Sequence, residues 1–92
     1  MAGVNDEQKR DVINRLKRIE GQVKGVQRMI EEDKCCADTL DQIAAARAAL
    51  YNAGVLLLER HARDCVMEAM AEGGEGEVID ELVRVIKKFA RS

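Results

Sequence analysis

Three side chains of this sequence, Cys36, His61 and Cys65, belong to the types that bind soft metal ions or carry thiol chemistry. His61 and Cys65 are four residues apart, so on a helix they are surface neighbours and form a two-ligand chelate. That pair alone is a weak signal, because a cysteine on an apolar helix stripe is more often part of a core. A single histidine, no glycine-rich phosphate loop and no recognisable nucleophile–base pair argue against an enzyme.

Three helices are expected to hold these residues in a single all-α domain spanning 1–92. The sequence contains no proline and few aromatic residues, and helix-forming types dominate. Apolar residues recur at three- and four-residue steps over about 6–32, 36–70 and 77–90, which predicts an amphipathic helix in each range. The runs EEDKCCAD (31–38) and GGEG (73–76) are predicted to separate the helices. The last helix is expected to bury Ile79, Leu82, Ile86 and Phe89.

The length of the second helix bears on assembly. Thirty-five residues rise by roughly 52 Å, whereas a compact monomer of this size has a radius of gyration near ~12 Å. An apolar stripe exposed along such a rod is unfavourable in water, and antiparallel pairing with the same helix of a second subunit would cover it. We therefore expect a dimer built as an antiparallel four-helix bundle. The stripe consists of Cys36, Leu40, Ile43, Leu50, Leu57, His61 and Cys65.

The same pairing completes the thiol and imidazole set. Within one chain, twenty-five residues of helix separate Cys36 from His61 by about 38 Å. In an antiparallel dimer, Cys36 of one subunit comes close to the partner subunit's His61 and the partner subunit's Cys65, twice by symmetry. Two thiolates and one imidazole form a soft set of three ligands that suits Cu(I), whereas structural zinc usually takes four ligands.

The charge distribution points to a polyanionic partner. The net charge is −2, but the segment from Lys9 to Arg28 carries seven basic residues against two acidic ones. One flank of the predicted helix holds Arg10, Lys17, Lys24 and Arg28, and the other holds Arg15, Arg18 and Gln22. Gly21 and Gly25 lie between the flanks, where a backbone could approach closely. A merely solvated helix face is the alternative interpretation.

The residues also carry a family resemblance over nearly the whole chain. The run RLKRIEGQVKGVQRMIEEDKCCADTLDQIAA, followed by HARDC, resembles the copper-sensing repressor (CsoR) family, which has nickel-, formaldehyde- and persulfide-sensing relatives. The resemblance implies a three-helix protomer and a disc-like tetramer made of two dimers. It implies a repressor that binds operator DNA of copper-efflux genes without metal and releases it when Cu(I) binds. It also implies copper ligands at Cys36, His61 and Cys65, and DNA contacts at Arg15, Lys17, Arg18 and Gln22.

Within that family the ligand pattern separates the sensors. Nickel- and cobalt-type members resemble chains with an N-terminal histidine, which residues 2–8 lack. Formaldehyde-type members generally lack a thiol at the position of Cys65, and persulfide-type members lack an imidazole at that of His61. Copper sensors often have tyrosine where this chain has Cys35, in a network with the histidine and a glutamate that matches Glu81.

Two other functions stay open. One is a thiol-based persulfide or redox sensor that uses Cys36 and Cys65 across the subunit interface. The other is a copper-buffering helical bundle that does not bind DNA, although the basic segment argues against it. The N-terminal run MAGVNDEQKR has no apolar segment of signal-peptide type, and no apolar run could span a membrane. We therefore expect a cytoplasmic protein whose cysteines are free thiols or metal ligands.

Overall fold

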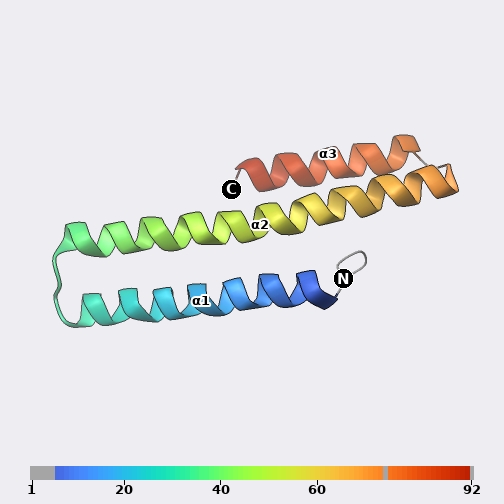
Figure 1. Ribbon diagram of the computed structural model, residues 1–92. Coiled ribbons are helices and arrows are strands. Elements are labelled where there is room, and N and C mark those ends of the chain that lie inside the picture. The colour runs from blue at the N-terminus through green and yellow to red at the C-terminus, as the bar shows by residue number, and fades with distance from the viewer. Residues whose placement is uncertain (1–5, 74, 92) are drawn as a thin grey trace. The chain divides into compact units, whose positions relative to one another are not determined.

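Three helices make up the computed structural model, which describes residues 6–73 and 75–91 (Figure 1). Helix α1 spans Asp6–Glu31, α2 spans Cys36–Glu72 and α3 spans Glu75–Arg91. The described residues contain no strand, so the predicted all-α class and three-helix protomer are confirmed. The predicted helix ends differ from these bounds by one or two residues, and α3 already begins inside the GGEG run.

Two compact units divide the chain, with the boundary after Leu56. In the N-terminal unit, α1 lies antiparallel to the first part of α2 (Figure 1). In the C-terminal unit, α3 lies against the last part of α2. The expected organisation as one domain over 1–92 stays a prediction.

The turn after α1 is made by Asp33, which adopts a left-handed backbone with φ of 54°. The Asp33 N–H donates to the Ile30 carbonyl at 3.1 Å, and the Lys34 N–H donates to the Met29 carbonyl at 2.9 Å. These two bonds form the Schellman arrangement that satisfies the last carbonyls of a helix. Aspartate is one of the few residues besides glycine that tolerates this conformation. The expected helix break is therefore confirmed here, with Asp33 acting through its backbone conformation at the end of α1.

The second helix is capped at both ends by hydrogen bonds of its own backbone. The Cys35 carbonyl accepts the Thr39 N–H at 3.0 Å and the Thr39 hydroxyl at 3.1 Å, which makes Cys35 the N-cap residue of α2. At the other end, the Gly73 N–H donates to the Ala69 carbonyl at 2.8 Å, and Gly73 has a φ of 79°. Glycine suits that position because a side chain is strained in the left-handed region.

The core of each unit is small. Val12, Ile19 and Ala53 are buried in the N-terminal unit, together with Thr39, and Ala69 is buried in the C-terminal unit. The apolar stripe of α2 stays uncovered within the chain: Leu40, Ile43 and Leu50 are 57%, 43% and 53% exposed.

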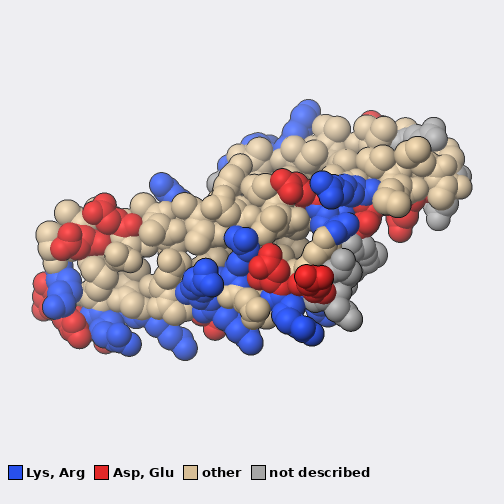
Figure 2. All heavy atoms as spheres, in the orientation of Figure 1, with Lys and Arg blue, Asp and Glu red and all other residues tan. Residues whose placement is uncertain are grey.

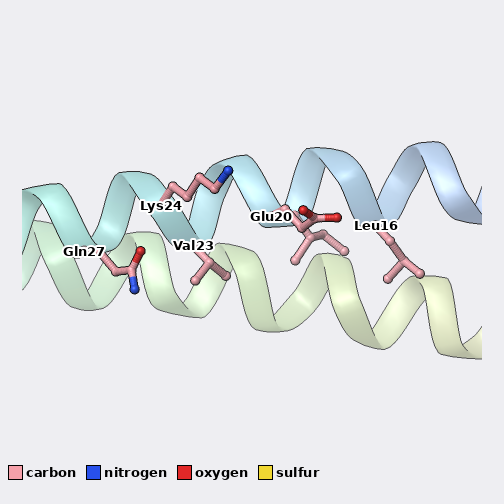
Figure 3. Close-up of a pocket in the computed structure, with 6 residues that line it drawn as sticks. Leu16, Glu20, Val23, Lys24 and Gln27 are labelled. Atoms are coloured by element: carbon pink, nitrogen blue, oxygen red, sulfur yellow. The ribbon is translucent and has the colours of Figure 1, made fainter.

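A shallow groove lies on α1 beside α2, lined by Leu16, Ile19, Glu20, Val23, Lys24 and Gln27. Figure 3 shows Leu16 and Val23 directed toward α2, whereas Lys24 extends away from it. Leu16 and Val23 nevertheless remain 37% and 47% exposed. One neighbouring helix therefore covers only part of the apolar face of α1.

The expectation that α3 buries four apolar side chains is wrong for two of them. Ile79 is 50% exposed and Ile86 is 41% exposed, whereas Leu82 and Phe89 are half-buried. The reason is that α3 packs against a single helix, which can cover only one side of its apolar face. None of the described helices has an apolar, weakly charged stretch long enough to cross a membrane.

Two glycine substitutions test this backbone. A Cβ built at Gly21 in α1, or at Gly73, meets no other atom of the described chain within 4 Å. Gly21→Ala should raise the free energy of unfolding by about 0.5–1 kcal/mol, because glycine costs conformational entropy inside a helix. Gly73→Ala, the matched control, should lower it by about 1–2 kcal/mol through left-handed strain. Urea unfolding followed by circular dichroism measures both. A destabilised Gly21→Ala variant would show instead that another subunit packs against α1 there.

Candidate functional site

The structure brings His61 and Cys65 together on one face of α2. The Cys65 Sγ lies 3.5 Å from His61 Nε2 and 3.9 Å from His61 Nδ1, and both residues are half-buried. An ion about 2.3 Å from a thiolate sulfur and about 2.0 Å from an imidazole nitrogen, as in protein zinc sites, holds these atoms about 3.5–3.7 Å apart. The observed spacing therefore fits a single metal ion held by both side chains.

The charges of nearby acidic residues act on the Cys65 thiol. Burial raises the pKa of Cys65, and the negative charges of Glu68, Glu81 and Asp64 raise that pKa further. One Asp64 oxygen, Oδ2, is buried and has no hydrogen-bond partner among the described residues. The free thiolate is thus disfavoured, while a cation at Cys65 would be stabilised by the same charges.

The environment of Cys65 includes Glu81, the residue that the family resemblance indicated. Two other acids in it were missed. Glu68 follows Cys65 by three residues and is therefore its neighbour on α2, so helix spacing could have identified it. Asp64 precedes Cys65 directly. No hydrogen bond between Glu81 and His61 is present, so their predicted network stays a prediction.

The third predicted ligand, Cys36, is the first residue of α2 and belongs to the N-terminal unit. It is exposed, and all three cysteines are free thiols. Within the described part of one chain, no three His, Cys, Asp or Glu side chains are close enough to hold a metal ion. A single subunit therefore supplies two neighbouring ligands, and the participation of Cys36 stays a prediction.

The pKa of Cys35 is shifted in the opposite direction to that of Cys65. It is exposed at the N-cap of α2, where backbone N–H groups of Asp38 and Ala37 donate to its sulfur and lower its pKa. Unpaired N–H groups and the helix dipole stabilise a negative charge at this end of a helix. Cys35 is thereby the cysteine whose thiolate is favoured.

The predicted DNA-contacting residues lie on α1. Arg15, Lys17 and Arg18 are exposed and Gln22 is half-buried, with its Oε1 atom buried and unpaired among the described residues. Arg15 Nε pairs with Asp11 Oδ2 at 3.5 Å. Because successive helix residues are about 100° apart, Arg18 and Gln22 share a flank with Arg15, whereas Lys17 lies on the other flank. Figure 2 shows basic side chains spread along α1.

The opposite pKa shifts predict the order in which the thiols react. Alkylation by iodoacetamide requires the thiolate, so in the metal-free protein Cys35 should react at lower pH than Cys65. Peptide mapping by mass spectrometry at a series of pH values measures both rates, and Cys35→Ser removes the fast signal. In denaturant the two pH profiles should converge, because the folded environment causes both shifts. Reaction of Cys65 at a pH equal to or below that of Cys35 would contradict this account.

Comparisons with known proteins identify relatives of this chain. Residues 8–88 match the family model described as metal-sensitive transcriptional repressor. The chain is 48% identical over 88 residues to the copper-sensing transcriptional repressor CsoR of Bacillus subtilis, covering 96% of this chain and 87% of that protein. It is 51% identical over 70 residues to the copper-sensing transcriptional repressor RicR of Mycobacterium tuberculosis, covering 76% of this chain and 73% of that protein.

Solved structures agree with the sequence relatives. The crystal structure of the copper-sensing repressor CsoR with Cu(I) from Geobacillus thermodenitrificans superposes with a TM-score of 0.87 at 49% identity, covering 98% of this chain and 94% of that one. The nickel-responsive transcriptional regulator InrS superposes with a TM-score of 0.81 at 38% identity, covering 87% and 90% of the two chains. The three-helix fold, the family match and the sequence identity agree, and the chain belongs to the metal-sensitive transcriptional repressor family.

Proposed function

We propose that this chain is a Cu(I)-responsive transcriptional repressor, which binds operator DNA of copper-resistance or efflux genes without metal and releases it with Cu(I). The observation that carries the proposal is the half-buried His61–Cys65 pair, with sulfur and nitrogen 3.5 Å apart. The relatives that are 48% and 51% identical are copper-sensing repressors, which supports the choice of metal. A regulator of this kind is a binding protein rather than an enzyme, and we place it in the cytoplasm.

The donor set favours copper over nickel. The similar fold of a nickel-responsive relative means that the helices alone do not select the metal. In our proposal, Cys36 of one subunit joins the partner subunit's His61 and the partner subunit's Cys65. Two soft sulfur donors and one imidazole nitrogen match the ligand preferences of Cu(I). The bound ion supplies positive charge and rigid coordination at this point of the subunit interface.

Assembly is required by this site and favoured by the uncovered apolar surface. Leu40, Ile43 and Leu50 lie on the α2 face that also carries Cys36, and about half of each is exposed. Antiparallel pairing of two α2 helices covers these residues and brings the ligands from opposite ends together. We propose a homodimer of this kind, and a tetramer of two such dimers.

The DNA surface is proposed on α1. It offers three cations and an amide, groups that contact the phosphates of duplex DNA. These residues are Arg15, Lys17, Arg18 and Gln22. Metal can release DNA only if it binds the DNA-free conformation more tightly than the DNA-bound one. A coupling of about 3 kcal/mol lowers operator affinity roughly a hundredfold.

His61 is the side chain best suited to transmit the signal. With one ring nitrogen committed to the site, the other can donate a hydrogen bond outside it. Glu81 of α3 is close enough for its charge to act on Cys65, and it is the acceptor that we assign to that nitrogen. A hydrogen bond of this kind would connect the site on α2 with α3.

Replacement of His61 tests the signal separately from the binding. Operator affinity of the metal-free protein, measured by fluorescence anisotropy, should fall about a hundredfold with Cu(I) and change little with Zn(II), Ni(II) or a persulfide donor. His61→Ala should keep appreciable copper binding through two thiolates but lose most of the release. Cys36→Ser and Cys65→Ser should weaken copper binding itself. If a persulfide donor releases the His61→Ala variant from the operator, the thiol-sensor alternative is favoured. If the parent protein does not bind the operator at all, the copper-buffering alternative is favoured.

Complementation tests the cross-subunit site. Cys36→Ala and His61→Ala/Cys65→Ala proteins each lack ligands at every site of their own homodimer. A mixed dimer regains one complete site, because one subunit keeps Cys36 and the other keeps the pair. Absorption titration of isolated mixed dimers should therefore give one high-affinity Cu(I) per dimer. Zero sites would indicate that all ligands come from one chain, and two would refute the cross-subunit arrangement.

A further inference from the structure

A stripe of polar residues runs along the face of α1 that points away from its core. Its members recur at alternating steps of four and three residues, as one helix face requires. The buried Val12 and Ile19 lie on the opposite side of the helix. We call this surface the outward stripe. It consists of Arg10, Asn14, Lys17, Gly21, Lys24 and Arg28, all of them exposed.

The structure records no ion pair for the four cations of the outward stripe with the side chains that it describes. On α1, the ion pair that the structure records is Arg15–Asp11, at 3.5 Å. No ion pair of Arg10, Lys17, Lys24 or Arg28 is recorded among the described side chains. No acidic residue lies on this face between Arg10 and Arg28, and the face continues with Glu7 and Glu31 at its two ends. A polyanion that binds there would not have to displace an existing ion pair.

The shape of the stripe fits a phosphate backbone. Near its N-terminal end, a surface hollow is lined by Lys9, Arg10, Ile13, Asn14 and Lys17, so three cationic residues and an amide lie beside one recess. From Arg10 to Arg28 the helix rises by about 27 Å. Each strand of duplex DNA has one phosphate for about every 3.4 Å of the duplex axis, so a stripe of this length spans several phosphates.

We infer that the outward stripe of α1 is a phosphate-contacting surface for duplex DNA, in addition to the flank that carries Arg15, Arg18 and Gln22. The inference rests on the proposed DNA-binding function and enlarges its interface. Both flanks of α1 then contact the duplex, and Lys17 belongs to the outward one. Because phosphate contacts carry no sequence information, the stripe adds affinity for any duplex and leaves operator preference to other groups.

The test removes three charges from the stripe. The variant Arg10→Gln/Lys24→Gln/Arg28→Gln keeps helix-forming side chains, and its matched control Arg84→Gln/Lys87→Gln/Arg91→Gln removes three exposed charges from α3. Arg15→Gln/Arg18→Gln serves as the comparison for the other flank. Affinities for the operator and for an unrelated duplex are measured by fluorescence anisotropy at several salt concentrations, and Cu(I) binding is followed by absorption.

The stripe variant should lose at least tenfold in affinity for both duplexes. Its slope of log affinity against log salt should fall by about 0.9 for each phosphate contact removed, with unchanged Cu(I) binding. An unchanged affinity and slope, or equal losses in the α3 control, would overturn the inference. If Arg15→Gln/Arg18→Gln then still weakens operator binding, the proposed repressor function stands without the stripe. A parent protein that binds neither duplex at low salt would instead refute the repressor function itself.

Discussion

Leu40, Ile43 and Leu50 remain about half exposed on α2 because a helix that packs against one neighbour at a time can bury only one of its sides. The rest of the structure depends on that constraint. Burial inside each unit is limited to a few small or medium side chains, which is a modest hydrophobic contribution for a domain. In the antiparallel dimer that we propose, a second copy would supply the missing apolar surface and would bring together the ligands from the two ends of α2. Stability and metal binding thus have the same requirement.

Two of the thiols show how local electrostatics distinguishes similar side chains. Cys35 precedes α2 and Cys65 lies within it, and the pKa of Cys35 is lowered by backbone N–H groups whereas that of Cys65 is raised by burial and carboxylates. The half-buried Cys65 thiol is protonated and therefore less easily oxidised than a thiolate. A cation bound beside it is favoured, because its charge neutralises the nearby acids. The Cys35 sulfur is exposed to solutes, and the lowered pKa of its thiol favours ionisation. The surroundings of the sulfur atoms therefore decide which of these two thiols ionises more easily.

Helix α1 has two different surfaces, an apolar one that packs on α2 and a cationic one. Its apolar face, with Val12 and Ile19 buried, packs on α2, while the cations occupy the remaining circumference. A net charge of −2 for the whole chain conceals this separation, because α2 carries six acidic residues against three basic ones. A local cationic surface on an acidic protein favours DNA as a partner and limits nonspecific attraction elsewhere.

Periodicity in the sequence alone determined the three helices, their apolar faces, the neighbourhood of His61 and Cys65 and the two basic flanks, because all of these follow from the fixed turn of a helix. It did not determine that Ile79 and Ile86 stay exposed, or that the charge of Glu81 acts on Cys65. Those features were decided only by the tertiary structure, since burial and charge act through space between residues of different elements. Glu81 reaches Cys65 only because α3 folds back on α2, and no spacing along the chain encodes that distance.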